Sequence, residues 1–278
     1  MQKKDSFISI IKGVITGIAS LISGVSPASC IVSLSSYENF ITGLSSIFKK
    51  EPNKKIKEEN KKILLLVTIS IFIGIVLGLV AGGNLINYFI GRYRSQTIFL
   101  FVGMITGGLT LIIKNKKITN IKKQIPVFVI SLVLVFSLYF LLMNYDISIP
   151  KGVLPIASGF ITSLMILVPG ISLSYVYNLL DKYSYIVSFS LSNIKDVLVV
   201  LMFVVVFILS LILIAKLISI LLNKYKEKCY SVICSLLILS IVAMILEVDK
   251  FTVSFVNIFT TILAFLWGYL LAKNIEKE

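Results

Sequence analysis

Long runs of apolar residues, separated by short lysine-rich tracts, make up most of the chain. Six runs have about the 17–25 residues that a helix needs to cross a bilayer. They cover residues 63–82, 96–113, 125–143, 196–221, 229–246 and 253–272. With 57% hydrophobic and only 14% charged residues, the chain has too much apolar surface for one water-soluble core. The pattern therefore predicts an all-α, polytopic integral membrane protein.

Two further apolar regions, 7–48 and 152–189, are each interrupted by a helix-breaking motif. The first reads Ser23-Gly24-Val25-Ser26-Pro27 and the second Pro169-Gly170-Ile171-Ser172. Proline and glycine end helices within a run. The arm before the first motif, residues 7–21, would extend only about 22 Å, which is less than the roughly 30 Å hydrocarbon core. We expect both regions to form broken re-entrant hairpins.

The cations test this topology. If each hairpin enters and leaves on one side and the six long runs cross, 21 of the 27 cations share a side with the N-terminus. An excess of lysine and arginine marks the cytoplasmic side. We therefore expect a multi-pass protein of the plasma membrane with both termini in the cytoplasm. A hairpin that crosses twice gives the same count, so this alternative stays open.

The two hairpin motifs belong to an internal repeat. A shift of about 146 places residues 23–38 on 169–184, and a shift of about 132 places Arg92-Tyr93-Arg94 on Lys224-Tyr225-Lys226. Residues 1–145 and 146–278 would each hold one hairpin and three spans. Because three is odd, the second half would be inserted upside down. An inverted repeat with discontinuous helices is a transporter architecture whose substrate site lies between the breaks.

The broken helices suggest an anion site. The start of a helix carries free amide groups and partial positive charge, which attract phosphate or carboxylate. Glycine lets the ligand approach the backbone, and serine hydroxyls bond to it. The alternative is an ordinary packed kink. The candidate substrate-binding residues at the breaks are Gly24, Ser26, Ser29, Gly170, Ser172 and Ser174.

Three charged residues extend this candidate site. Glu38 lies late in the second arm of the first hairpin, where an acid needs a partner or an aqueous cavity. It could couple transport to protons or pair with a cation that grips phosphate. Arg92 and Arg94 are the only arginines and fall on the predicted outer side, where they could collect a phosphate headgroup. The alternatives are a solvated acid and an interfacial pair of arginines.

These motifs resemble those of the polyprenyl-phosphate transporter (PopT) family. The family motifs read approximately P-G-V-S-G-G-T, followed by Y-E, and P-G-I-S-G-S. Here Tyr37-Glu38 matches the Y-E pair, whereas Pro27-Ala28 and Leu173 stand where the family has glycine. The resemblance implies a divergent transporter that returns undecaprenyl phosphate from the outer to the cytoplasmic leaflet. This lipid carrier is then reused in cell-wall polymer synthesis.

Other classes fit the sequence poorly. The chain has no histidine, which excludes a Ser-His-Asp triad, and it has no metal-ligand cluster or nucleotide-binding loop. We expect no enzyme activity, no cofactor or metal, and no nucleic-acid partner. The expected partners are the polyprenyl-phosphate lipid, the bilayer and a coupling proton or ion; the oligomeric state is left open. The alternatives are a small-anion transporter or channel, and a non-transporting paralogue or scaffold.

Overall fold

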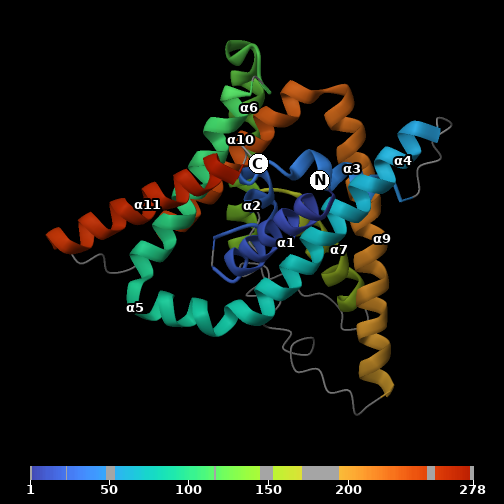
Figure 1. Cartoon of the computed structure of the whole chain (residues 1–278), viewed down its shortest axis with the longest axis horizontal. Coiled ribbons are helices and arrows are strands. Elements are labelled where there is room, and N and C mark those ends of the chain that lie inside the picture. The colour runs from blue at the N-terminus through green and yellow to red at the C-terminus, as the bar shows by residue number, and fades with distance from the viewer. Residues whose placement is uncertain are drawn as a thin grey trace.

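The computed structural model describes residues 2–22, 24–47, 54–115, 117–144, 153–170, 194–248 and 254–275. Within these ranges all the regular secondary structure is helical (Figure 1). The predicted binding residues Ser172 and Ser174 lie outside the described residues.

The first hairpin begins with α1 (Gln2–Ala19), which ends before the predicted break. Gly24 has a φ of +83°, a conformation that glycine adopts without the Cβ penalty of other residues. The chain then enters the short helix α2 (Pro27–Ser33), with Pro27 in its first turn, where a missing N–H costs nothing. The predicted break at the first motif is therefore present.

The sequence suggested one continuous second arm for this hairpin, but the structure divides that arm into two helices. α2 ends at Ser33, and a new helix, α3 (Tyr37–Ser45), follows. Ser35 has a φ of +54°, and the Ser36 N–H donates to the Ile31 carbonyl at 3.1 Å, which is the closure of a Schellman turn. Glu38 therefore lies in the first turn of α3, not late in a long arm.

A single helical run follows, and it contains the first two predicted spans. It comprises α4 (Lys54–Ile63), the π-helix η1 (Leu64–Ile69) and α5 (Ser70–Lys114). α5 kinks at Tyr93, whose φ is −136° and ψ is 47°. At 1.5 Å per residue, the parts of α5 before and after Tyr93 each extend about 30–35 Å, enough to cross a bilayer. Figure 1 shows α5 changing direction along its length.

The other long runs each lie in one helix. These are α6 (Ile121–Asn144), α9 (Ile194–Lys224), α10 (Lys226–Leu246) and α11 (Phe255–Ile275). The expected first arm of the second hairpin is α7 (Leu154–Leu167), after which Gly170 has a φ of +85°. The expected second arm lies outside the described residues. Within the described residues, four helical segments are long and apolar enough to span a membrane: Lys55–Lys114, Val197–Lys224, Lys226–Leu246 and Phe255–Ile275. The chain is an all-α, polytopic membrane protein.

Glycines bring the two parts of α5 into backbone contact with neighbouring helices. A Cβ atom on Gly13 of α1 would overlap the carbonyl of Ile71 and would lie 2.8 Å from the Cα of Gly74. Gly17 meets Gly78 in the same way one turn later. Beyond the kink, Gly103 of α5 approaches the backbone of α11 just as closely. These close contacts are the small-residue packing typical of membrane helices.

The helix pairs correspond between the two halves of the predicted repeat. α1 packs on α5 as α7 packs on α9, and α11 packs on the far part of α5 as α6 packs on α10. The backbone conformation also corresponds, because Tyr225 has a φ of −133° and a ψ of 48°, close to the values at Tyr93. The inverted repeat remains a prediction, and these correspondences favour it.

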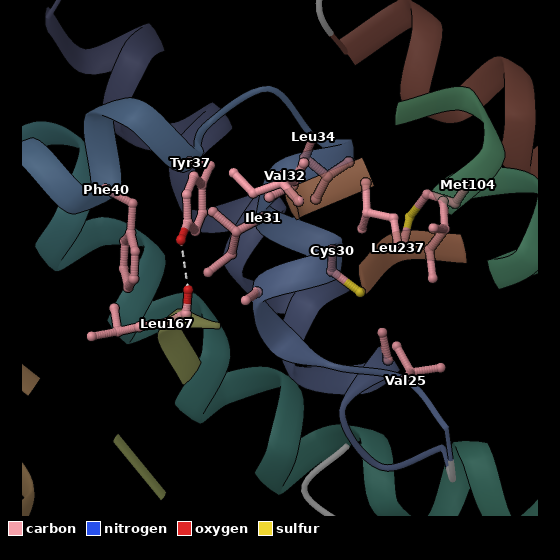
Figure 2. Close-up of a cluster of buried hydrophobic side chains, with 14 of the residues drawn as sticks. Val25, Cys30, Ile31, Val32, Leu34, Tyr37, Phe40, Met104, Leu167 and Leu237 are labelled. Atoms are coloured by element: carbon pink, nitrogen blue, oxygen red, sulfur yellow. Dashed lines mark hydrogen bonds between the residues drawn. The ribbon is translucent and has the colours of Figure 1, made fainter. Parts of the chain in front are cut away.

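The core is built around α2, all seven residues of which are buried. Figure 2 shows its apolar side chains between those of the surrounding helices, with Met104 of α5 and Leu237 of α10 nearby. Tyr37 of α3 points towards Leu167 of α7 in the same view. The first hairpin is therefore the centre of the molecule, and the spans surround it.

Candidate functional site

The two predicted breaks contact each other. The Gly170 N–H donates to the Ser29 hydroxyl at 3.0 Å, and the Tyr37 hydroxyl donates to the Leu167 carbonyl at 2.7 Å (Figure 2). The Ser26 hydroxyl makes a longer contact with the Val168 carbonyl, at 3.4 Å. The last carbonyls of a helix lack partners within it, so Tyr37 and Ser26 of the first hairpin satisfy those at the end of α7.

This contact lies deep in the membrane-spanning part of the molecule. A Cβ atom on Gly170 would lie 2.7 Å from the carbonyl oxygen of Leu236, which stands midway along α10, about 15 Å from either end. Gly24 lies beside a later turn of α10, where its carbonyl accepts a hydrogen bond from the Ser240 hydroxyl at 3.0 Å. The two breaks therefore meet near the middle of α10.

The hydroxyls predicted to bind substrate are occupied by protein in this conformation. Ser26 and Ser29 are fully buried and bond to the α7 end and to Gly170. Their role in holding phosphate stays a prediction, because they would first have to separate from the second motif. What they do here is join the two hairpins.

The two arginines line a wide cavity at the kink of α5, near the end of α10, and we call this end of the molecule the arginine end. The cavity has a volume of about 810 Å³ and lies between the kink of α5 and the start of α11. Its polar wall includes Gln96, whose amide donates to Asn257 at 2.6 Å and to Thr260 at 3.0 Å. Apolar residues such as Phe89 and Val256 form much of the rest. A wall of this mixed kind fits an amphiphilic ligand.

Arg92 and Arg94 differ in their partners. Arg94 is paired: its Nε donates to the Glu247 carbonyl at 3.0 Å, and its guanidinium lies 3.3 Å from the Glu247 carboxylate. Arg92 is exposed and stands 6.0 Å from the Tyr93 ring. Within the described ranges, Arg92 has no acidic partner. Its guanidinium is therefore available to an anion in the cavity.

Glu38 is the centre of a charge cluster at the opposite end of α10, which we call the lysine end. Its Oε1 atom accepts three hydrogen bonds: from the Tyr230 hydroxyl at 2.6 Å, from Lys117 Nζ at 3.0 Å and from Lys226 Nζ at 3.2 Å. Lys117 lies between α5 and α6, and the other two donors lie at the start of α10. Three separate parts of the chain, α3, the α5–α6 segment and the start of α10, thus meet at one carboxylate only because the helices are packed as they are.

The donors stabilise the charged form of Glu38. Burial raises the pKa of this carboxyl, but the hydrogen bonds from Tyr230 and the two lysines outweigh burial and hold the pKa below its ordinary value. A polar cavity of about 200 Å³ adjoins the cluster. Glu38 therefore has both the partner and the cavity that the sequence analysis required of it.

The sequence analysis missed several of these residues. Tyr230, Lys117 and Lys226 carry no local signal that links them to Glu38, because the contacts are between distant segments. Lys12 of α1 could have been found, since it is a lone cation within an apolar run. It is partly buried and donates to the Ser36 hydroxyl at 3.1 Å, beside the turn that leads to Glu38.

A family model matches most of the chain. The family model described as "VCA0040-like: Undecaprenyl phosphate translocase-like" matches residues 15–272, which include both breaks, both arginines and the Glu38 cluster. No curated protein and no solved structure matches the chain. Because the family model covers nearly the whole sequence, the chain belongs to the undecaprenyl phosphate translocase-like family.

Proposed function

We propose that the chain moves a polyprenyl phosphate across the membrane, from the outer to the cytoplasmic leaflet, and that the arginine end receives the lipid. The observation that carries the proposal is the guanidinium of Arg92, which has no acidic partner among the described residues and lies in a wide cavity with a partly apolar wall. A guanidinium binds phosphate through two parallel hydrogen bonds. The family match supports the same class of substrate.

The route would run along α10. Lys226 and Glu247 mark its two ends and are about 32 Å apart at 1.5 Å per residue, close to the thickness of the hydrocarbon core. The meeting point of the breaks lies between them. A headgroup would pass from Arg92 to this level and then to the lysine end, while the isoprenoid chain stays in lipid. The protein then has to shield only the phosphate.

Separation of the two breaks would open the middle of the route. The bonds from Ser29 to Gly170 and from Tyr37 to Leu167 join the hairpins now. When one half rocks against the other, the Ser29 hydroxyl and the Gly170 amide become free for phosphate oxygens. Lys12, on the side of the first hairpin, would add a positive charge next to this path.

Reconstitution tests the proposal. Purified chain that elutes as one folded species is placed in liposomes with labelled undecaprenyl phosphate in the outer leaflet. We expect exchange between leaflets to be faster than in protein-free vesicles. A second arm follows uptake of free phosphate, and a third imposes a pH gradient to detect coupling to protons.

The arms separate the alternatives. Phosphate uptake without lipid exchange would replace the proposal by a small-anion transporter. Neither lipid exchange nor phosphate uptake, from protein that is folded, would contradict transport and favour a non-transporting paralogue. Lipid exchange that responds to the pH gradient would add proton coupling to the proposal.

A further inference from the structure

We infer that Lys117, Lys226 and Tyr230 form a second binding site, for a phosphate monoester at the lysine end, and that the Glu38 carboxylate occupies it as a built-in competitor. The inference rests on the proposed function for the identity of the lipid, but the anion site itself stands on its own geometry. It gives the lysine end a role in release of the headgroup.

Three donor groups surround one acceptor oxygen at the lysine end. A single carboxylate oxygen, Glu38 Oε1, accepts from two ammonium groups and one phenol within 2.6–3.2 Å. Two cations around one acid leave one positive charge uncompensated within the cluster. A phosphate monoester carries up to two negative charges and three acceptor oxygens, so it matches these donors better than one carboxylate does.

An anion can reach the lysine donors from water. The side chains of Lys117 and Lys226 are 28% and 52% exposed, so an anion can reach both from water. Tyr230, in contrast, is buried and fixed, and Lys117 Nζ lies 5.5 Å from the centre of its ring. The polar cavity of about 200 Å³ beside Glu38 offers space for the carboxylate to withdraw into or for a phosphate to enter.

An apolar cavity lies next to the polar cavity beside Glu38. Tyr37 lines both the polar cavity and a second cavity of about 440 Å³, which is lined largely by apolar residues of α9 and α10. A phosphate at Lys117 and Lys226 would therefore have this apolar cavity next to it. This arrangement fits the phosphate of an isoprenyl lipid better than a free phosphate ion.

Competition gives the site its function. While Glu38 holds the three donors, α3 is tied to the start of α10 and the donors are occupied. An arriving phosphate displaces the carboxylate and breaks this tie. When the lipid leaves, Glu38 returns to the donors and prevents the headgroup from binding again.

Binding measurements in nanodiscs test the site. The probes are inorganic phosphate and farnesyl phosphate, measured by calorimetry against empty nanodiscs. Glu38→Gln keeps the size of the side chain but removes its charge. We expect it to bind both probes about tenfold more tightly than the unaltered chain, the factor for a competitor present about nine-tenths of the time. Adding Lys117→Gln to this variant should abolish the gain, and Lys61→Gln, an exposed lysine of α4, should not.

The results are read as differences, because the arginine end is the same in all these proteins. Unchanged affinity in Glu38→Gln, or a gain that survives Lys117→Gln, would overturn the inference. Tighter binding of inorganic phosphate alone would overturn the role in lipid release. If Glu38→Gln does not fold, Glu38→Asp, which withdraws the carboxylate by one methylene, should give a smaller gain; an affinity equal to that of the unaltered chain would then overturn the inference.

The liposome assay keeps this inference distinct from the proposed function. Lipid exchange by the unaltered chain together with no effect of Glu38→Gln on binding would remove the site and leave the transporter. A gain in phosphate affinity in a chain that exchanges no polyprenyl phosphate would leave the site and remove the lipid.

Discussion

Each end of the molecule has a cluster of two cations and one carboxylate, arranged differently. The cluster at the arginine end is Arg92, Arg94 and Glu247, and that at the lysine end is Lys117, Lys226 and Glu38. At the arginine end Glu247 pairs with Arg94, and Arg92 is left facing a cavity of about 810 Å³. At the lysine end both lysines converge on Glu38, beside a cavity of about 200 Å³. The arginine end is open to an external anion, whereas at the lysine end the protein's own carboxylate, Glu38, binds the cations. An equal charge count therefore says little about accessibility, which depends on where the single acid lies.

The largest effect should come from Arg92, the cation that has no acidic partner in the described ranges. Arg92→Gln should lower the initial rate of lipid exchange at low lipid concentration by about 10- to 100-fold, because a hydrogen bond to a charged group contributes about 1.5–3 kcal/mol. Rates in liposomes check this. Lys273→Gln, at the other end of α11, is the matched control and should exchange lipid normally. Equal rates for Arg92→Gln and the unaltered chain would show that the open cavity is not where the lipid is received.

The second prediction concerns the breaks that connect the two ends. Gly170→Ala should lower stability by roughly 1–2 kcal/mol or more, because a residue with a Cβ pays this cost at positive φ and would also meet the Leu236 carbonyl. The apparent midpoint of thermal unfolding, at a fixed scan rate, measures it. Gly83→Ala is the control: it lies inside α5 with open space around it and should keep or raise the midpoint. A midpoint unaffected by Gly170→Ala would mean that this break does not hold the hairpins together.

The third prediction separates the ends by pH. The pKa of Glu38 lies below its ordinary value of 4.5, so its contribution to stability is complete above that pH. The contribution is lost as the pH falls through the lowered pKa, when the carboxyl takes up a proton and the lysines lose their partner. Unfolding midpoints measured from pH 6 down to pH 3 should fall less for Glu38→Gln than for the unaltered chain. Parallel curves would contradict a stabilising cluster at the lysine end.

The smallest effect should come from the paired arginine. Arg94→Lys keeps the charge but loses the Nε donor to the Glu247 carbonyl. Because both side chains of the pair are about 40% exposed, the loss in stability should be below about 1 kcal/mol. Its lipid exchange should be far closer to normal than that of Arg92→Gln. A larger effect at Arg94 than at Arg92 would reverse our reading of the arginine end.

Much of the fold could be predicted from the sequence, because membrane spans follow directly from apolar length. The breaks at Gly24 and Gly170 were also predictable, since glycine and proline mark them. The turn at Ser35 was not, because serine only weakly disfavours a helix and its positive φ depends on tertiary contacts. The spans 63–82 and 96–113 were predicted as separate helices, whereas the structure joins them in one helix that kinks at Tyr93.

The candidate site was less predictable than the fold. Glu38, Arg92 and Arg94 could be singled out because charges are rare in this chain. Their partners could not: Lys117 is 79 residues from Glu38, and Tyr230 is 192 residues away. Such pairs form only once the helices pack. The same packing places Ser26 and Ser29 against the end of α7, a structural role that the motif alone does not reveal.

The glycine contacts between α1 and α5 restrict how this protein can move. Where Gly13 and Gly17 touch Gly74 and Gly78, backbone lies on backbone, and no side chains are available to change rotamer and let the helices slide. The first arm of the hairpin and the near part of α5 must therefore travel as one rigid body. Bending is then confined to joints where the backbone leaves helical φ and ψ values, and Tyr93 and Tyr225 supply such joints at opposite ends of the molecule.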